Sequence, residues 1–152
     1  MINNGEPSVV EFNMRFGDPE TQVVLPRLKT DLLKVFKAIV NNRLDQIKLE
    51  WNDFSAVCVV LASKGYPASS SKGDVISGVS SLDSSETQFV IQAGTKQESH
   101  QLLTNGGRVL GVVGTGGSIE AAIQSSYQAV ELIQFDGAHY RKDIGAKAVN
   151  VQ

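Results

Sequence analysis

Three polar side chains near the N-terminus, Glu11, Asn13 and Arg15, occupy every second position and alternate with apolar ones. In a β-strand successive side chains point to opposite faces, so this spacing predicts one polar and one apolar face. A carboxylate and an amide oxygen two residues apart, about 6.6 Å along the strand, can converge on a hard cation such as Mg²⁺. Arg15 on the same face can reach phosphate or carboxylate groups that the metal also holds. The same alternation is typical of any half-exposed antiparallel strand, so spacing alone leaves both interpretations open.

The residues after this segment predict a turn and the start of a helix. Gly17 permits a tight exit from the strand, and Asp18 can cap a helix. Pro19 suits the first helical position, where its missing N–H loses no partner. The polar strand face and the capped helix are therefore expected to be contiguous.

The residues before this segment predict a β-hairpin. Asn4-Gly5 supplies the positive φ angles of a tight turn, and residues 8–16 form the outgoing strand. Only Met1 and Ile2 are left for the incoming strand. Since a native domain rarely begins two residues before a hairpin, we expect a C-terminal fragment of a longer protein.

The next elements are predicted to be helical. A short helix should cover residues 19–25 and be interrupted by Pro26, which lacks an amide donor. Thr30 or Asp31 then starts a helix that runs to about residue 42. Its apolar residues recur at steps of one, three and four and form one packing face, namely Leu32, Leu33, Phe36, Ile39 and Val40.

From Trp51 onward the pattern changes to strands and one main helix. Strands are predicted at 55–63, 75–79 and 88–93, and a hairpin at 101–104 and 108–113 around Asn105-Gly106-Gly107. A helix should follow at 118–133, with an inner face formed by Ile119, Ala122, Ile123, Val130 and Ile133. The second unit is therefore predicted to be α+β.

Six motifs resemble one enzyme family. The run from Glu11 to Gln22 resembles the signature of glycinamide ribonucleotide synthetase, or phosphoribosylamine-glycine ligase, in the ATP-grasp superfamily. The later motifs follow in the order and approximate spacing of that family's C-terminal region: Gly65-Tyr66-Pro67, Gly73-Asp74-Val75-Ile76, Ala93-Gly94-Thr95, Thr104-Asn105-Gly106-Gly107-Arg108-Val109-Leu110 and Arg141-Lys142-Asp143-Ile144-Gly145. Together these motifs span nearly the whole chain. Two departures are local: Gln92 stands where family members often have histidine, and Ser70 lies near a position where members often have tyrosine.

The resemblance implies an α+β architecture in two parts. Residues 1–48 would be the C-terminal edge of an ATP-grasp domain, a hairpin strand plus helices. Residues 49–152 would be a small β-rich C-terminal domain with one main helix. Most of the ATP-grasp unit and a preceding nucleotide-fold domain would lie upstream.

The resemblance also implies roles for five residues. Glu11 and Asn13 would coordinate Mg²⁺ or Mn²⁺ that bridges the phosphates of ATP, and Arg15 would contact phosphate or the developing charge of an acyl phosphate. Asp18 would face the substrate amine, although chemistry alone favours an N-cap, and the two roles can coexist. Arg108 is a further substrate-binding candidate, because the family places its segment near the nucleotide cleft.

The activity implied is ATP-dependent ligation of glycine to 5-phosphoribosylamine in purine biosynthesis, through a glycyl phosphate intermediate. The partners are then ATP, glycine, 5-phosphoribosylamine and the missing N-terminal part of the chain. The fragment alone is expected to be inactive. Two alternatives stay open: another ATP-grasp carboxylate-amine ligase or carboxylase subunit, and a noncatalytic association module that uses an exposed strand edge.

Composition excludes several other classes. A formal net charge of -2 with scattered Lys and Arg gives no basic footprint for nucleic acid. The longest apolar run, residues 56–62, is far below the roughly 18 residues of a membrane span, and no secretory signal is visible. The single cysteine, Cys58, lies in that run and is expected to be buried and unreactive. These features favour the cytoplasm.

The remaining candidates have a structural interpretation. The glycine-rich run 114–118 fits neither phosphate-binding glycine motif and is expected to be a turn that ends in a Ser118 cap. Arg141 and Lys142 are expected to lie on a solvated face. His100 and His139 lack ligand-spaced partners.

Overall fold

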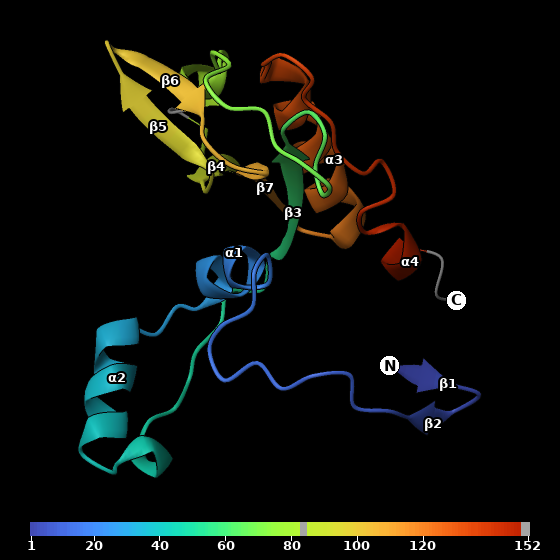
Figure 1. Ribbon diagram of the computed structural model, residues 1–152. Coiled ribbons are helices and arrows are strands. Elements are labelled where there is room, and N and C mark those ends of the chain that lie inside the picture. Colours follow the sequence, from blue (N-terminus) through green and yellow to red (C-terminus); the bar gives the residue numbers. More distant parts are fainter. Residues whose placement is uncertain (83–84, 150–152) are drawn as a thin grey trace.

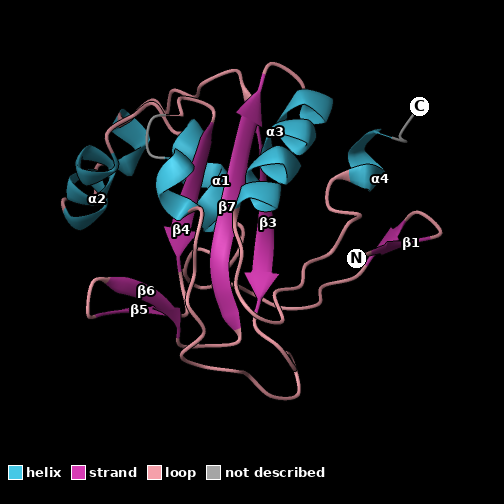
Figure 2. Ribbon diagram, turned by 90° about the horizontal axis from the view of Figure 1, so that it is seen from above, coloured by secondary structure: helices cyan, strands magenta, loops and turns pink. Residues whose placement is uncertain are grey.

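A computed structural model describes residues 1–82 and 85–149. Its centre is an antiparallel sheet in the order β3-β7-β4, formed by β3 (Ser55–Ala62), β7 (Arg108–Gly116) and β4 (Gln88–Gln92). Helix α3 (Ile119–Leu132) lies against β7 and β3 (Figures 1 and 2). The predicted strands at 55–63 and 88–93 and the predicted helix at 118–133 are confirmed.

The core lies between this sheet and α3. Alternate residues of β3, among them Val59 and Leu61, are fully buried against Ala122 and Val130 of α3. Cys58, Val60 and Ala62 occupy the alternate positions of β3 and point to the other face of the sheet. One sheet face therefore holds the core, and the other is available for the N-terminal segment and the candidate site.

The glycine-rich run 114–118 lets α3 approach β7 closely. A Cβ on Gly114 would lie 2.1 Å from the backbone nitrogen of Ser126, and Ser126 Oγ donates a hydrogen bond of 2.9 Å to Val112 O. Strand β7 continues through Gly116, so the turn is shorter than predicted. The predicted cap is confirmed, because Ser118 Oγ accepts from Ala121 N.

A second, two-stranded sheet corrects the predicted hairpin at 101–113. Strand β6 (Gln101–Thr104) pairs with β5 (Thr95–Glu98), not with β7, and the β5–β6 turn contains His100 at a φ of 64°. Residues 105–107 instead connect the two sheets, because Asn105 N donates to Gly94 O and Gly94 N donates to Arg108 O. Gly106 lies close to the Gly94 backbone: a Cβ on Gly106 would be 3.1 Å from Gly94 Cα, a tighter contact than most side chains make.

The predicted strand at 75–79 was also wrong. Val75 and Ser77 make isolated bridges to Leu103 and Gln134, and the short helix η3 (Val79–Leu82) follows. Gly78 has a φ of 86°, and a Cβ there would lie 1.8 Å from Leu132 O. This backbone conformation ends any strand at that position.

The N-terminal segment begins with the predicted hairpin. Strands β1 (Ile2–Asn3) and β2 (Glu6–Pro7) pair across Asn4 and Gly5, both at positive φ. The expected continuation over residues 8–16 is not a strand here, since no described strand lies beside it to accept its hydrogen bonds. Figure 1 shows this stretch, the arm (residues 8–16), extending away from the sheet.

Two helices follow the arm. Helix α1 (Thr21–Val24) continues into η1 (Leu25–Arg27), and Pro19 is preceded by a cis peptide bond. Asp18 is therefore not the N-cap that the sequence predicted; Glu20 holds that position without a side-chain cap bond. Pro26 ends the α-helical turn but is accommodated in η1.

Helix α2 (Leu32–Val40) begins at Asp31, whose carboxylate accepts from Leu33 N over 2.8 Å, as predicted. The short helices η2 (Leu44–Gln46) and α4 (Ala146–Val149) complete the described elements. The predicted packing face of α2 is largely exposed, because among the described elements α2 packs mainly against η2. In the described part of the chain, no helix has the length and apolarity to cross a membrane.

Candidate functional site

The three polar residues of the arm contact one another in series. Arg15 Nη1 donates to Asn13 Oδ1 over 2.5 Å, and Asn13 Nδ2 donates to Glu11 Oε1 over 3.4 Å. All three side chains are exposed. The structure thus places Glu11, Asn13 and Arg15 on one side of the arm, although the arm is not a strand.

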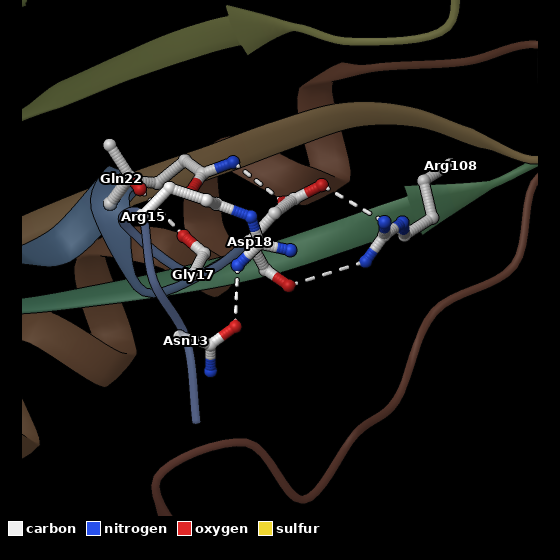
Figure 3. A network of polar contacts seen from close by, with 7 residues as sticks. Asn13, Arg15, Gly17, Asp18, Gln22 and Arg108 are labelled. Atoms are coloured by element: carbon white, nitrogen blue, oxygen red, sulfur yellow. Dashed lines mark hydrogen bonds and ion pairs between the residues drawn. The ribbon is translucent and has the colours of Figure 1, made fainter. Parts of the chain in front are cut away.

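Asp18 and Arg108, two predicted substrate-binding residues 90 positions apart, form an ion pair. Arg108 Nη2 lies 3.0 Å from Asp18 Oδ2, and Arg108 Nη1 donates to Asp18 O over 3.3 Å. Gln22 Nε2 donates to the second carboxylate oxygen over 2.9 Å. Figure 3 shows Asp18 held between Gln22 and Arg108. Both oxygens of Asp18 are therefore oriented by neighbours from two different parts of the chain.

This ion pair positions side chains more than it stabilises the fold. Asp18 and Arg108 are each almost half exposed, and exposed pairs typically contribute about 0–1 kcal/mol. The turn that carries Asp18 is fixed separately, because Gly17 O accepts hydrogen bonds from both Thr21 N and Thr21 Oγ1. The geometry of the carboxylate is thus specified at modest energetic cost.

The family-like motifs around Arg108 support its backbone. Gly94 N donates to Arg108 O over 2.9 Å, and a Cβ on Gly94 would lie 2.6 Å from that oxygen. Gly107 leaves room for the ring of Tyr66, since a Cβ on Gly107 would lie 2.4 Å from that ring. Ser63 N donates a hydrogen bond to Gly107 O. Motifs that are distant in the sequence therefore meet where Arg108 begins β7.

The motif at Gly73-Asp74 is also structural. Asp74 accepts hydrogen bonds from Ser71 Oγ over 2.6 Å and from buried Thr104 Oγ1 over 3.0 Å. These bonds hold the pKa of the Asp74 carboxyl below its usual value. The network ties the loop before residue 75 to the end of β6.

A cavity of about 540 Å³ opens on the sheet face opposite α3. Cys58, Val60 and Ala62 form part of its lining, and Arg108 and Arg141 also border it. Burial, reinforced by the negative charge of Asp18, raises the pKa of the Cys58 thiol to about 11, so the thiol stays protonated at neutral pH. The expectation of a buried Cys58 is confirmed.

Arg141, expected only on a solvated face, is exposed and also borders this cavity. Its guanidinium makes two hydrogen bonds to Asp143, of 2.9 and 2.6 Å, and its carbonyl accepts from Tyr127 Oη. His139 and Tyr66 line the same cavity. The sequence alone did not group these residues with Arg108, because Tyr66 lies in the loop after β3 whereas His139 and Arg141 lie in the loop after α3.

A second hollow, of about 420 Å³, is bordered by Asp18 together with Phe16, Gln22 and Ile91. Gln22 Oε1 is buried there without a hydrogen-bond partner among the described residues. Sequence reasoning missed Gln22 as a site residue. Its position four residues after Asp18, within the predicted helix at 19–25, was the available signal.

The oxygen donors of the arm suit a hard cation. Among residues 1–82 and 85–149, no three His, Cys, Asp or Glu side chains converge as a metal site. Glu11 and Asn13 offer one carboxylate and one amide oxygen, ligand types that Mg²⁺ uses when substrate phosphates and water complete its shell. The donor chemistry fits Mg²⁺ or Mn²⁺ bound together with a phosphate ligand.

Comparison with known families decides where the chain belongs. Residues 56–147 match the family model described as phosphoribosylglycinamide synthetase, C domain. The chain belongs to this family. The match covers Arg108 and Arg141 but begins after Asp18, so the ion pair connects the C domain to the segment that precedes it.

Relatives of the C domain extend the similarity to the whole chain. A phosphoribosylamine–glycine ligase of Fusobacterium nucleatum is 47% identical over 100% of this chain and 36% of its own length. One from Synechocystis is 50% identical over 95% of this chain and 35% of its own length. A bifunctional purine biosynthetic protein of Dictyostelium discoideum is 49% identical over 94% of this chain. The chain thus spans about a third of the length of the first two relatives.

A solved structure supports the mixed α/β fold. The crystal structure of phosphoribosylamine–glycine ligase from Thermotoga maritima matches 94% of this chain and 34% of its own, with a TM-score of 0.72 and 35% identity. The C domain and the preceding segment therefore have counterparts in one solved enzyme. The boundary between residues 48 and 49 stays a prediction.

Proposed function

We propose that this chain is the C-terminal part of an ATP-dependent ligase that joins glycine to 5-phosphoribosylamine in purine biosynthesis. The observation that carries the proposal is the similarity of the whole chain, arm and C domain together, to enzymes named phosphoribosylamine–glycine ligase. The ion pair between Asp18 and Arg108 supports it, since it joins two candidate substrate residues across these two parts.

The proposed reaction has two steps. An oxygen of the glycine carboxylate attacks the γ-phosphorus of ATP, which gives glycyl phosphate and releases ADP. The amine of 5-phosphoribosylamine then attacks the acyl carbon, the C–O bond to phosphate breaks, and the amine loses a proton. The products are glycinamide ribonucleotide, ADP and phosphate. Positioning and electrostatics supply the acceleration, so no side chain of this chain acts as a nucleophile.

The arm serves the phosphate side of this reaction. Glu11 and Asn13 would hold Mg²⁺ or Mn²⁺, which when bound neutralises phosphate charge and orients the phosphates. Arg15 donates to Asn13 Oδ1 in the present structure. When that oxygen ligates a cation, the guanidinium is free to donate to the phosphate of ATP or of the acyl phosphate.

Asp18 serves the amine side. Its carboxylate accepts hydrogen bonds from the attacking amine, and its negative charge favours the amine as it gains positive charge in the transition state. Gln22 and Arg108 fix the carboxylate from both sides. The Arg108 guanidinium can also move from Asp18 to an anionic substrate group, because its side chain is almost half exposed.

A chimera tests this proposal. In the chimera this chain replaces the matching C-terminal third of the Fusobacterium nucleatum enzyme, and formation of glycinamide ribonucleotide is measured with all three substrates. We expect turnover from the chimera and none from the isolated chain. Robust turnover by the isolated chain, or a folded chimera that accepts a different amine or carboxylate from a substrate panel, would contradict the proposal.

Glu11→Ala tests the metal role in the same chimera. The substitution should lower kcat by roughly 100-fold while leaving the unfolding temperature unchanged, because the side chain is exposed and its hydrogen bond from Asn13 is long and exposed as well. Asn3→Ala, on the exposed β1–β2 hairpin, is the control and should change neither. An unchanged kcat at saturating Mg²⁺ and ATP would remove Glu11 from the site.

A further inference from the structure

The chain segment between α3 and α4 forms part of the larger cavity, of about 540 Å³ (Figure 1). Four of its residues border that cavity, namely His139, Tyr140, Arg141 and Ile144. The segment runs along the edge of β3, because His139 N and Ala62 N each donate to the other residue's carbonyl oxygen, over 3.1 and 2.9 Å. It then returns to α3. The loop 141–145, which carries the motif Arg-Lys-Asp-Ile-Gly, therefore lies between the cavity and α3.

One hydroxyl group of α3 holds this loop. Tyr127 Oη donates to Arg141 O over 2.8 Å and accepts from Ile144 N over 3.1 Å. In many four-residue turns the first carbonyl accepts directly from the fourth N–H. Here the hydroxyl bonds to both groups and takes the place of that bond. The turn is thus held open by a side chain whose ring packs against the core and lies 6.2 Å, between ring centroids, from Tyr140.

The guanidinium of Arg141 is oriented separately. Its Nε and Nη2 donate to the two oxygens of Asp143, over 2.9 and 2.6 Å. Both side chains are mostly exposed, so this pair contributes little to the stability of the fold. Among the described residues none accepts from Nη1, which can therefore donate to a ligand. Tyr127 and Asp143 together fix the backbone and the head group of Arg141.

The lining of the cavity suits a ligand with an uncharged body and a phosphate. Its apolar sheet face presents Cys58, Val60 and Ala62, whereas two guanidinium groups, of Arg108 and Arg141, border it. The carboxylates that pair with these arginines are not among its lining residues. Guanidinium groups match the geometry of phosphate oxygens. Of the three proposed substrates, 5-phosphoribosylamine is the one that consists of a sugar and a single phosphate.

We propose that the Tyr127 hydroxyl is a positioning group of the ligase, which sets the loop 141–145 so that Arg141 Nη1 donates to the phosphate of 5-phosphoribosylamine. This inference rests on the proposed function for the identity of the ligand. It also gives the other motif residues a purpose. Asp143 orients the guanidinium, and Ile144 presents its N–H to Tyr127. Gly145 has a φ of 83°, and a Cβ there would lie 2.7 Å from Ile123 Cδ1, so glycine lets the loop close onto α3.

Tyr127→Phe removes the hydroxyl and keeps the ring. The carbonyl of Arg141 and the N–H of Ile144 then lose their shared partner, so we expect the turn to close by a direct bond between them. Closure moves the backbone that carries Arg141 away from its present position. The consequence should be weaker phosphate binding in a protein that stays folded.

Binding is measured on this chain itself, because every residue that lines the cavity belongs to it. The probe is ribose 5-phosphate, which carries a hydroxyl where the substrate has its amine, and the titration is followed by amide chemical shifts in nuclear magnetic resonance spectra. Arg141→Gln should weaken binding by about tenfold or more, and Tyr127→Phe by about fivefold. Binding that is absent, or that Arg141→Gln leaves unchanged, would overturn the proposal. Equally tight binding of inorganic phosphate would overturn its assignment to a sugar phosphate.

Two comparisons separate positioning from a merely structural role. Ser125→Ala removes another hydroxyl of α3, whose 3.2 Å hydrogen bond goes to Thr87 O, away from the lining of the cavity, and it should leave the affinity unchanged. In the double variant, Tyr127→Phe should add nothing to the effect of Arg141→Gln, because the hydroxyl acts through that residue. Additive losses, or an equal loss from Ser125→Ala, would refute the positioning role.

Kinetics of the chimera supply an independent measurement. Tyr127→Phe should raise KM for 5-phosphoribosylamine by about fivefold and change kcat and KM for ATP by less than about twofold. A fall in kcat with an unchanged KM would contradict the proposal. Binding of ribose 5-phosphate that depends on Arg141 and Tyr127, together with a folded but inactive chimera, would contradict the proposed function and leave the phosphate site standing. An active chimera whose KM neither variant alters would do the reverse.

Discussion

Replacing Gly114 by alanine should destabilise the C domain by about 3 kcal/mol. The new Cβ would lie 2.1 Å from Ser126 N and 2.6 Å from Ser126 Cα, so the backbone of α3 must move by about 1.3 Å to restore ordinary contact. Such overpacking costs about 1–3 kcal/mol. Displacing α3 also weakens the buried hydrogen bond from Ser126 Oγ to Val112 O, at about 1 kcal/mol.

The assay is unfolding of the isolated chain by denaturant and by heat, each followed by far-ultraviolet circular dichroism. For a domain of this size, 3 kcal/mol corresponds to a fall in Tm of about 10 °C. Gly117→Ala is the matched control: nothing lies within 4 Å of its Cβ, and stability should change by less than about 0.5 kcal/mol. A Gly114→Ala protein as stable as the control would show that α3 does not pack on β7 as closely as described.

Three further predictions concern the candidate site and its surroundings. Asp18→Asn and Arg108→Gln should each lower kcat/KM for 5-phosphoribosylamine in the chimera by more than about tenfold. Each should change the free energy of unfolding by less than about 1 kcal/mol, because the ion pair is almost half exposed. A loss of stability with unchanged kinetics would show that the pair is structural. Cys58 should react with a thiol reagent at pH 8 about 100-fold or more slowly than a free thiol, because its pKa is near 11, and a rate equal to that of glutathione would contradict its burial. Asp74 has a lowered pKa in the folded state, so its contribution to folding stability is fully present above the pKa of the unfolded chain and is lost as the pH falls through the pKa of the folded state. Asp74→Asn should therefore flatten the fall in stability at acid pH. An unaltered fall would refute the Ser71 and Thr104 contacts.

Local signals in the sequence predicted those elements that depend on local physics. Helix α2 begins at its capping residue, Asp31, and α3 at Ser118, because caps satisfy amide groups within one turn. Strand β3 was recognisable from a continuous apolar run that the sheet buries on both faces. These features need no knowledge of distant residues.

Features that depend on tertiary contacts could not be predicted in this way. Gly106 and Gly107 suggested a hairpin turn. In the structure, glycine is needed there for packing, because Gly94 lies against Gly106 and the Tyr66 ring lies against Gly107. The arm has the alternation of a strand, but a strand forms only beside a partner. Neither the packing partner nor the strand neighbour is encoded near the residues concerned.

The candidate site was predicted in part. Asp18 and Arg108 were each identified as substrate-binding candidates, but their ion pair joins positions 90 apart and required the fold. Gln22 was missed because its role depends on the orientation of Asp18. The substrate and metal roles of Glu11, Asn13, Arg15, Asp18 and Arg108 stay predictions.

The most direct test of the proposed ligase follows oxygen from glycine. The chimera is supplied with ATP, 5-phosphoribosylamine and glycine labelled with ¹⁸O in its carboxylate, and the released phosphate is analysed by mass spectrometry. Attack of the carboxylate on ATP predicts that one labelled oxygen appears in each phosphate, together with glycinamide ribonucleotide. Product formation with unlabelled phosphate would contradict the acyl phosphate route, and a folded chimera that forms no product would contradict the assignment of this chain to the ligase.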